Sequence, residues 1–103
     1  MPLNIQIAST AEQVFSVKLT GSIEEETYVS LQKKLDSLIQ GNFKQIVLDM
    51  KGVDYISSAG IGVLVASKTA TEKKGASFAI INMQPNVRKI IEVMRLSQIL
   101  NVS

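Results

Sequence analysis

The chain has 103 residues, of which 46% are hydrophobic, and a formal net charge of +2, values that suit one folded domain and leave no room for a second. Because it contains neither Cys nor His, disulfides, thiolate or histidine metal sites, Cys nucleophiles and Ser-His-Asp triads are excluded. The short basic pairs lie far apart without interleaved aromatic residues, which argues against nucleic-acid binding: Lys33-Lys34, Lys73-Lys74 and Arg88-Lys89.

The N-terminus, from Met1 to Asn4, has neither the basic start nor the apolar run of a signal peptide. No apolar stretch approaches the roughly 20 residues that a membrane-spanning helix needs. We therefore expect a soluble, cytoplasmic protein that does not insert into a membrane.

The start of the chain predicts an antiparallel hairpin. Leu3, Ile5 and Ile7 alternate with polar or small residues, the pattern of a strand with one buried face. After a short polar stretch, residues 14–19 predict a second strand, and Gly21 closes the hairpin.

A helix is predicted next. Ser22 and Glu25 form a capping-box signature, and Glu24 and Glu26 complement the positive end of the helix dipole. Gly41-Asn42 is a C-terminal stop. The apolar stripe of this helix, with spacings of three and four, consists of Tyr28, Leu31, Leu35, Leu38 and Ile39.

The second half of the chain predicts a strand, a helix, a strand and a last helix. Residues 46–48 form a short apolar run, typical of a strand covered on both faces, which ends at Asp49. A helix over 59–74 ends at Gly75, residues 78–81 form a strand, and Pro85 begins the last helix. The stripe of this last helix is Val87, Ile90, Ile91 and Met94.

The tail, with Ile99, Leu100 and Val102, fits either a last strand or a docked segment. The order β-β-α-β-α-β-α predicts an α/β fold: a small single domain with a mixed sheet of about four or five strands and a right-handed parallel crossover.

Ser57 and Ser58 fall where a buried strand leads into a helix, the place at which ligand and partner sites collect in α/β sheets. Free N–H groups in a first helical turn can hold an anion. Gly60 and Gly62 each cost helix stability of about 1 kcal/mol relative to Ala. Two interpretations stay open: a serine cap with glycines that allow close packing inside the domain, or a surface that a partner approaches closely.

The stretch from Asp49 to Leu64 resembles the signature of STAS domains, in which an Asp that ends a strand is followed by a loop, Asp-Ser-x-Gly-x-Gly and an apolar helix. Asp49 matches the first Asp, Ser58 the phosphorylatable Ser, and Gly60 and Gly62 the two glycines. The apolar positions hold Ile61, Val63 and Leu64.

The segment from Gly21 to Glu24 resembles the family's Gly-x-Leu/Ile-Asp after the second strand, with Glu in place of Asp. Length and element order also match a free-standing member, which implies one STAS domain over residues 1–103. The chain departs from the pattern at Ser57, where the family usually has Asp before the phosphorylated Ser. Asp54 lies four residues upstream of Ser58.

Resemblance to the anti-sigma factor antagonists of this family implies a protein switch that is not an enzyme and has no cofactor of its own. The unmodified chain would bind an anti-sigma factor that is itself a serine kinase and supplies ATP and magnesium. Phosphorylation of Ser58 would end the binding, and a phosphatase would restore it. The residues implied in partner binding are Glu24, Asp49, Ser57, Ser58, Ala59, Gly60, Ile61 and Gly62.

Two alternatives stay open. One is a module of the same fold that is not phosphorylated, either a scaffold in a signalling assembly or a ligand-binding component of a lipid-transport complex. The other is a small enzyme that uses Ser58 with a carboxylate such as Asp49 or Asp54.

The remaining notable residues predict structural roles. The run from Glu24 to Glu26 is interpreted as a solvated first helical turn and not as a metal site. Tyr28 and Tyr55 are predicted to be partly buried packing residues, and Met83 and Met94 to fill the core or an interface.

Overall fold

The computed structural model describes residues 3–96 and residue 100, and its elements follow the predicted order. None of the described helices is both long and apolar enough to cross a membrane. The elements are β1 (Asn4–Ala11), β2 (Val14–Ile23), α1 (Tyr28–Gln40), β3 (Gln45–Ile56), α2 (Ser58–Lys73), β4 (Ser77–Ile81) and α3 (Pro85–Val93).

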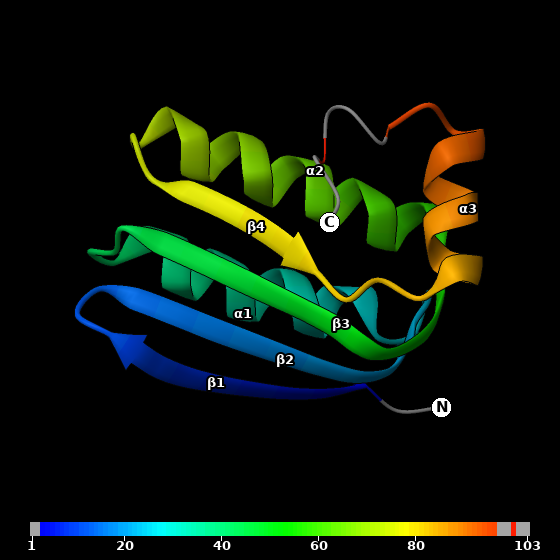
Figure 1. Ribbon diagram of the computed structural model, residues 1–103, viewed down its shortest axis with the longest axis horizontal. Coiled ribbons are helices and arrows are strands. Elements are labelled where there is room, and N and C mark those ends of the chain that lie inside the picture. Colours follow the sequence, from blue (N-terminus) through cyan, green and yellow to red (C-terminus); the bar gives the residue numbers. More distant parts are fainter. Residues whose placement is uncertain (1–2, 97–99, 101–103) are drawn as a thin grey trace.

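The four strands form one mixed sheet in the order β1-β2-β3-β4. β1 and β2 pair antiparallel, as the hairpin predicted, whereas β2 with β3 and β3 with β4 pair parallel. Helices α1 and α2 pack against each other along the sheet, and α3 lies against β3 at the end of the sheet where that strand leads into α2 (Figure 1).

The core lies between the sheet and the two long helices. The predicted stripe of α1 is confirmed, because Leu31, Leu35 and Ile39 are buried. From α2, Ile61 and Leu64 are buried against the sheet residues. The hydrophobic effect, which favours the removal of apolar surface from water, is the main force that holds these aliphatic side chains together.

β3 differs from its prediction in length and burial. It runs to Ile56, so Asp49 lies within the strand and not at its end; the pairing with β4 stops at Asp49, but the pairing with β2 continues. Ile46 and Leu48 are buried, whereas Val47 between them is only half-buried. The expectation of a strand covered on both faces is therefore wrong, because α1 and α2 pack together on one side of the sheet.

The predicted capping box is also wrong. Ser22 is a buried residue of β2, and α1 begins six residues later, at Tyr28. Thr27 holds the turn between them, since its hydroxyl accepts a hydrogen bond from the Glu24 N–H (2.9 Å) and donates one to the Ser22 carbonyl (2.8 Å). Residues 24–26 therefore form this turn and not the first turn of the helix.

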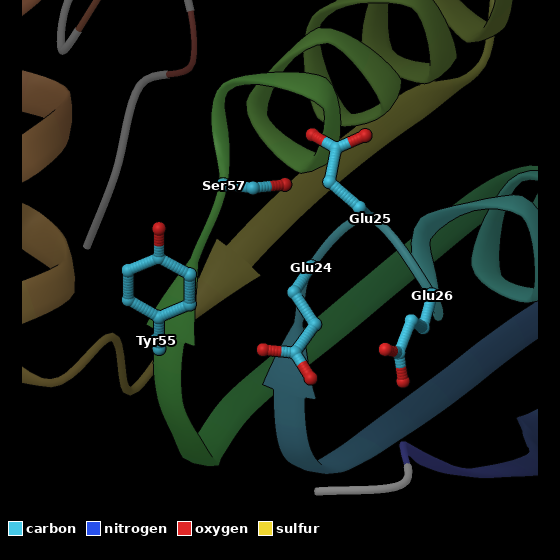
Figure 2. A pocket seen from close by; sticks show the side chains of 5 residues that line it. All are labelled: Glu24, Glu25, Glu26, Tyr55 and Ser57. Atoms are coloured by element: carbon cyan, nitrogen blue, oxygen red, sulfur yellow. The ribbon is translucent and has the colours of Figure 1, made fainter.

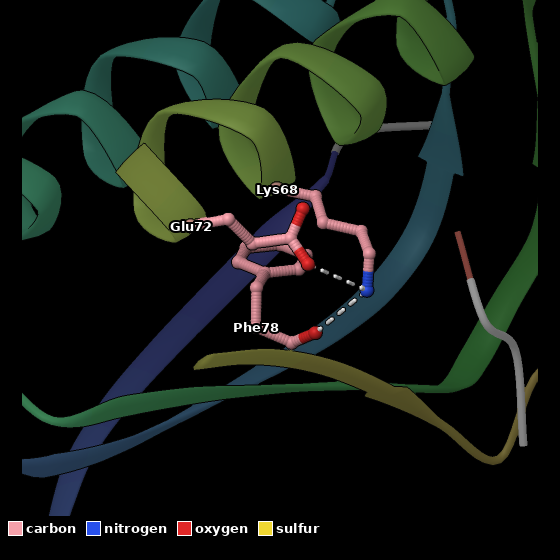
Figure 3. A network of polar contacts seen from close by, with 3 residues as sticks. All are labelled: Lys68, Glu72 and Phe78. Atoms are coloured by element: carbon pink, nitrogen blue, oxygen red, sulfur yellow. Dashed lines mark hydrogen bonds and ion pairs between the residues drawn. The ribbon is translucent and has the colours of Figure 1, made fainter. Parts of the chain in front are cut away.

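α2 is attached to β4 by a side chain as well as by apolar packing. The Lys68 ammonium donates to the Phe78 carbonyl (3.4 Å) and lies 3.9 Å from a carboxylate oxygen of Glu72 (Figure 3). Because the Glu72 side chain is 60% exposed, this ion pair contributes little stability, on the order of 0–1 kcal/mol. Only the hydrogen bond to Phe78 crosses from α2 to β4, since Lys68 and Glu72 belong to the same helix.

The ends of the last elements agree with the sequence. Gly75 has φ +78°, a conformation suited to glycine, and follows α2 directly after its capping residue. Pro85 occupies the start of α3. Leu100 is fully buried, whereas the predictions for Ile99 and Val102 fall outside the described residues.

Candidate functional site

The junction between β3 and α2 is built around Ser57. Its N–H donates to the Ile23 carbonyl at the end of β2 (2.7 Å), and its hydroxyl accepts from the Gly60 N–H (3.1 Å). Ser57 is therefore the N-cap of α2, and its side chain satisfies one of the free N–H groups of the first turn. With 8% of its surface exposed, it is a poor target for an enzyme.

Ser58 is the first residue of α2, and unlike Ser57 it is exposed. The two adjacent serines thus have separate roles: one hydroxyl holds the helix end, and the other lies at the surface beside the positive end of the helix dipole. Of the two, only Ser58 combines exposure with a hydroxyl that the cap does not use.

Gly60 and Gly62 also have separate roles. A Cβ added to Gly60 would lie 2.5 Å from Ile23 Cγ2 and 2.9 Å from Ile56 Cγ1, so this glycine allows the helix to approach the sheet. Gly62 is exposed, and a Cβ there would meet no atom within 4 Å. The packing interpretation therefore holds for Gly60, and Gly62 leaves an open surface one helical turn from Ser58.

An acidic hollow of about 330 Å³ lies beside the junction, lined by Glu24, Glu25, Glu26, Tyr55 and Ser57 (Figure 2). The Ser57 hydroxyl is directed toward the side of the hollow on which Glu25 lies. Tyr55 is 47% exposed, so the prediction that it is a partly buried packing residue is wrong, whereas the prediction for Tyr28 holds. Within the described part of the chain, no group of carboxylates is placed to hold a metal ion.

Asp49 and Asp54, the carboxylates considered for an enzyme, are bonded to other groups. Asp49 Oδ1 accepts from the Lys51 N–H (3.0 Å) and from Asn82 Nδ2 (3.2 Å). Asp54 Oδ1 accepts from the Ser22 hydroxyl (2.7 Å). Among the described residues neither carboxylate accepts a hydrogen bond from Ser58, so the geometry gives no support to a serine activated by a neighbouring carboxylate.

The predicted partner-binding residues divide by exposure. Ser58 and Gly62 are exposed, Glu24, Asp49 and Ala59 are half-buried, and Ser57, Gly60 and Ile61 are buried. The last three can support the surface but offer little of their own side chains to a partner.

The sequence prediction missed Glu25, Glu26 and Tyr55 as residues that line the hollow. The run of three glutamates was a visible signal, but it was assigned to the first turn of the helix. Tyr55 gave no signal, because its place beside the hollow depends on the irregular pairing of β2 with β3, which local sequence does not show.

A model of the STAS domain family matches residues 6–103. The chain belongs to the STAS domain family. The observed sheet and helices agree with the α/β fold of solved members.

Among similar proteins, the anti-sigma F factor antagonist of Paenibacillus polymyxa is 26% identical over 97% of this chain and 87% of its own. The anti-sigma-B factor antagonist of Staphylococcus aureus is 23% identical over 100% of this chain and 94% of its own. The anti-sigma factor antagonist SpoIIAA, in its unphosphorylated form, superimposes with a TM-score of 0.81 at 19% identity, over 92% of this chain and 84% of that chain. The phosphorylated form of Bacillus SpoIIAA gives a TM-score of 0.75 at 18% identity, over 92% of this chain and 86% of that chain.

Proposed function

We propose that this chain is an anti-sigma factor antagonist controlled by phosphorylation of Ser58. Unmodified, it binds an anti-sigma factor that is also a serine kinase and so frees a sigma factor. The kinase, with its own ATP and magnesium, transfers phosphate to Ser58 and the complex separates; a phosphatase then regenerates the binding form. The chain contributes the acceptor and no catalysis, and its place of action in this proposal is the cytoplasm.

The observation that carries the proposal is that the two adjacent serines differ in exposure and in hydrogen bonding. Ser58 is exposed at the first position of α2, where the family's phosphorylated Ser falls, while Ser57 is buried and caps the helix through Gly60. A kinase can therefore reach Ser58 without removing the cap. The names of the similar proteins and the existence of a phosphorylated SpoIIAA structure support the same role.

Phosphate at this position would act on the complex more than on the fold. It adds about −1.5 to −2 charges at pH 7. Beside a helix N-terminus that charge is favourable in the free domain. Inside an interface it has to be desolvated, and the neighbouring hollow already carries Glu24, Glu25 and Glu26. The domain should stay folded while the complex weakens.

The test is phosphate transfer from the anti-sigma serine kinase encoded in the same genome, followed by site mapping with mass spectrometry. We expect one phosphate on Ser58, none on Ser58→Ala, and normal transfer to Ser57→Ala once its stability has been checked. Phosphate on Ser57, or transfer to Ser58→Ala, would refute the assignment.

A negative charge at position 58 should weaken the complex with the anti-sigma factor as phosphorylation does. Ser58→Asp should weaken binding to the anti-sigma factor at least tenfold, which corresponds to about 1.4 kcal/mol, because a carboxylate must then be buried in the contact. Ser37→Asp, at an exposed position of α1, is the matched control for an added charge. Equal affinities of Ser58→Asp and the control, measured by calorimetry at fixed salt, would mean that Ser58 lies outside the interface.

One observation favours a second candidate, a STAS module that binds its partner without being phosphorylated. The position before the acceptor holds Ser57, a neutral cap, where the family usually has Asp. A scaffold in a signalling assembly or a ligand-binding component of a lipid-transport complex would then be the role. A stable complex with the kinase, without any phosphate transfer to the unmodified chain, would establish this candidate instead.

A further inference from the structure

The end of β3 carries an extra residue just before the site. Gly21 of β2 pairs with Val53, and the next residue, Ser22, pairs with Tyr55, so Asp54 has no counterpart on β2. This is a β-bulge, a feature that bends a strand and redirects side chains and that is common next to functional sites. Gly21 has φ +119°, which suits the distorted pairing.

Asp54 is hydrogen-bonded on both sides of the bulge. Its carboxylate accepts from the hydroxyl of Ser22 on β2 (2.7 Å), and its carbonyl accepts from the amide of Asn86 on α3 (2.6 Å). Ser22 is only 6% exposed, whereas Asp54 is exposed. A surface carboxylate thus holds a buried hydroxyl that no partner protein can reach directly.

On the Ser22 side, the network is connected to the start of α2, where the phosphate acceptor Ser58 lies. The Ser22 carbonyl accepts from the Thr27 hydroxyl (2.8 Å), which closes the turn that carries the acidic residues of the hollow. The next residue, Ile23, accepts from the Ser57 N–H (2.7 Å) and so holds the N-terminus of α2. Movement of Ser22 would therefore shift both the acidic turn and Ser58.

The Asn86 end leads to α3. β4 stops at Ile81, and the segment that follows continues beside β3 with side-chain amides instead of a backbone ladder. Gln84 Nε2 donates to the Lys51 carbonyl (2.7 Å), two residues before Asn86 makes its contact with Asp54. Both bonds are exposed, and these amides bind carbonyls of β3 beyond Asp49, where its pairing with β4 has ended.

We infer that Asp54 is a positioning residue of the phosphorylation site. It holds the acidic turn and the N-terminus of α2 in the geometry that the kinase binds, through Ser22 on one side and Asn86 on the other, without touching the kinase. This inference rests on the proposed function, because it assigns a role toward the same acceptor, Ser58.

The test compares steady-state phosphorylation of four variants by the anti-sigma serine kinase. Asp54→Ala and Ser22→Ala should each raise KM at least about fivefold with kcat within about twofold, since a misplaced surface weakens binding but leaves the hydroxyl intact. Asp54→Asn keeps an oxygen that can accept from Ser22 and should stay within about twofold of the unmodified chain. Asp36→Ala removes an exposed carboxylate from α1 and is the matched control.

Two results of the kinetic test would overturn the inference. If Asp54→Ala and Ser22→Ala are both phosphorylated normally, the network does not position the site. If Asp54→Asn is as poor a substrate as Asp54→Ala, the kinase recognises the negative charge of Asp54 by direct contact. A double variant of Ser22 and Asp54 should be no worse than either single variant, because both remove the same contact.

Amide exchange of the free protein supplies a second readout that needs no kinase. In Asp54→Ala and Ser22→Ala the Ser57 amide, bonded to Ile23, should exchange at least about tenfold faster, and by a larger factor than the amide of Leu35 in the core of α1. An equal increase at Ser57 and Leu35 means global destabilisation and would overturn the inference. If the unmodified chain is not phosphorylated at all, the proposed function fails, and amide exchange alone decides whether Asp54 positions this end of the domain.

Discussion

Exchanging Gly60 and Gly62 for alanine, one at a time, should change stability in opposite directions. Both residues lie in α2, so each substitution gains a similar helix propensity of about 0.5–1 kcal/mol. At Gly62 the new methyl group meets open space. At Gly60 it would lie 2.5 Å from Ile23 Cγ2 and 2.9 Å from Ile56 Cγ1.

The steric cost at Gly60 follows from what surrounds it. Ile23 is 0% and Ile56 1% exposed, so neither side chain can move aside into solvent. Overpacking of this kind costs about 1–3 kcal/mol. Because the propensity gain is common to both variants and cancels, Gly60→Ala should be less stable than Gly62→Ala by about 1–3 kcal/mol.

Thermal and urea unfolding of the two variants measure this difference. For a domain of about 100 residues, 1 kcal/mol shifts Tm by roughly 4–8 °C, so Gly60→Ala should melt at least about 4 °C below Gly62→Ala. Gly62→Ala should itself melt slightly above the unmodified protein. Equal Tm values for the two variants would refute the reasoning, since they would show that the helix does not need glycine to approach the sheet at position 60.

Three further substitutions test other contacts by the same unfolding measurements. Ser57→Ala should lose about 1 kcal/mol of stability with the cap while Ser58→Ala loses little; the reverse order would contradict the assignment of the cap. Thr71→Val should stabilise the domain by about 1 kcal/mol, because the fully buried Thr71 hydroxyl has no hydrogen-bond partner among the described residues; a loss of stability would show that the hydroxyl is satisfied. Lys74→Met should cost about 1 kcal/mol, since the ammonium donates to the carbonyls of Ile39 and Gly41 at the end of α1; an unchanged Tm would mean that water replaces it.

Local patterns were sufficient to predict most elements of this domain. The stripe of α1, the glycine after α2 and the proline at the start of α3 each depend on neighbours within a few residues, and the structure confirms them. The position of Ser58 at the start of a helix also followed from local sequence, because an apolar run begins directly after it. The resemblance to STAS domains then came from residues that are close together in the chain.

The tertiary structure decided the features that depend on residues far apart in the chain. The local sequence predicts that Ser22 is a helix cap. Its hydroxyl instead donates to Asp54, 32 residues away, and its backbone pairs with β3, so it belongs to a strand. The different roles of Gly60 and Gly62 depend on where Ile23 of another element lies.

The same holds for the two serines. A pair of adjacent hydroxyls before a helix does not say which one caps it, because the cap is the residue whose backbone leaves the strand in an extended conformation. Here the bond between the Ser57 N–H and the Ile23 carbonyl selects Ser57 and leaves Ser58 exposed. Pairing between β2 and β3, with its bulge at Asp54, sets that bond, and strand register is a property of the assembled sheet.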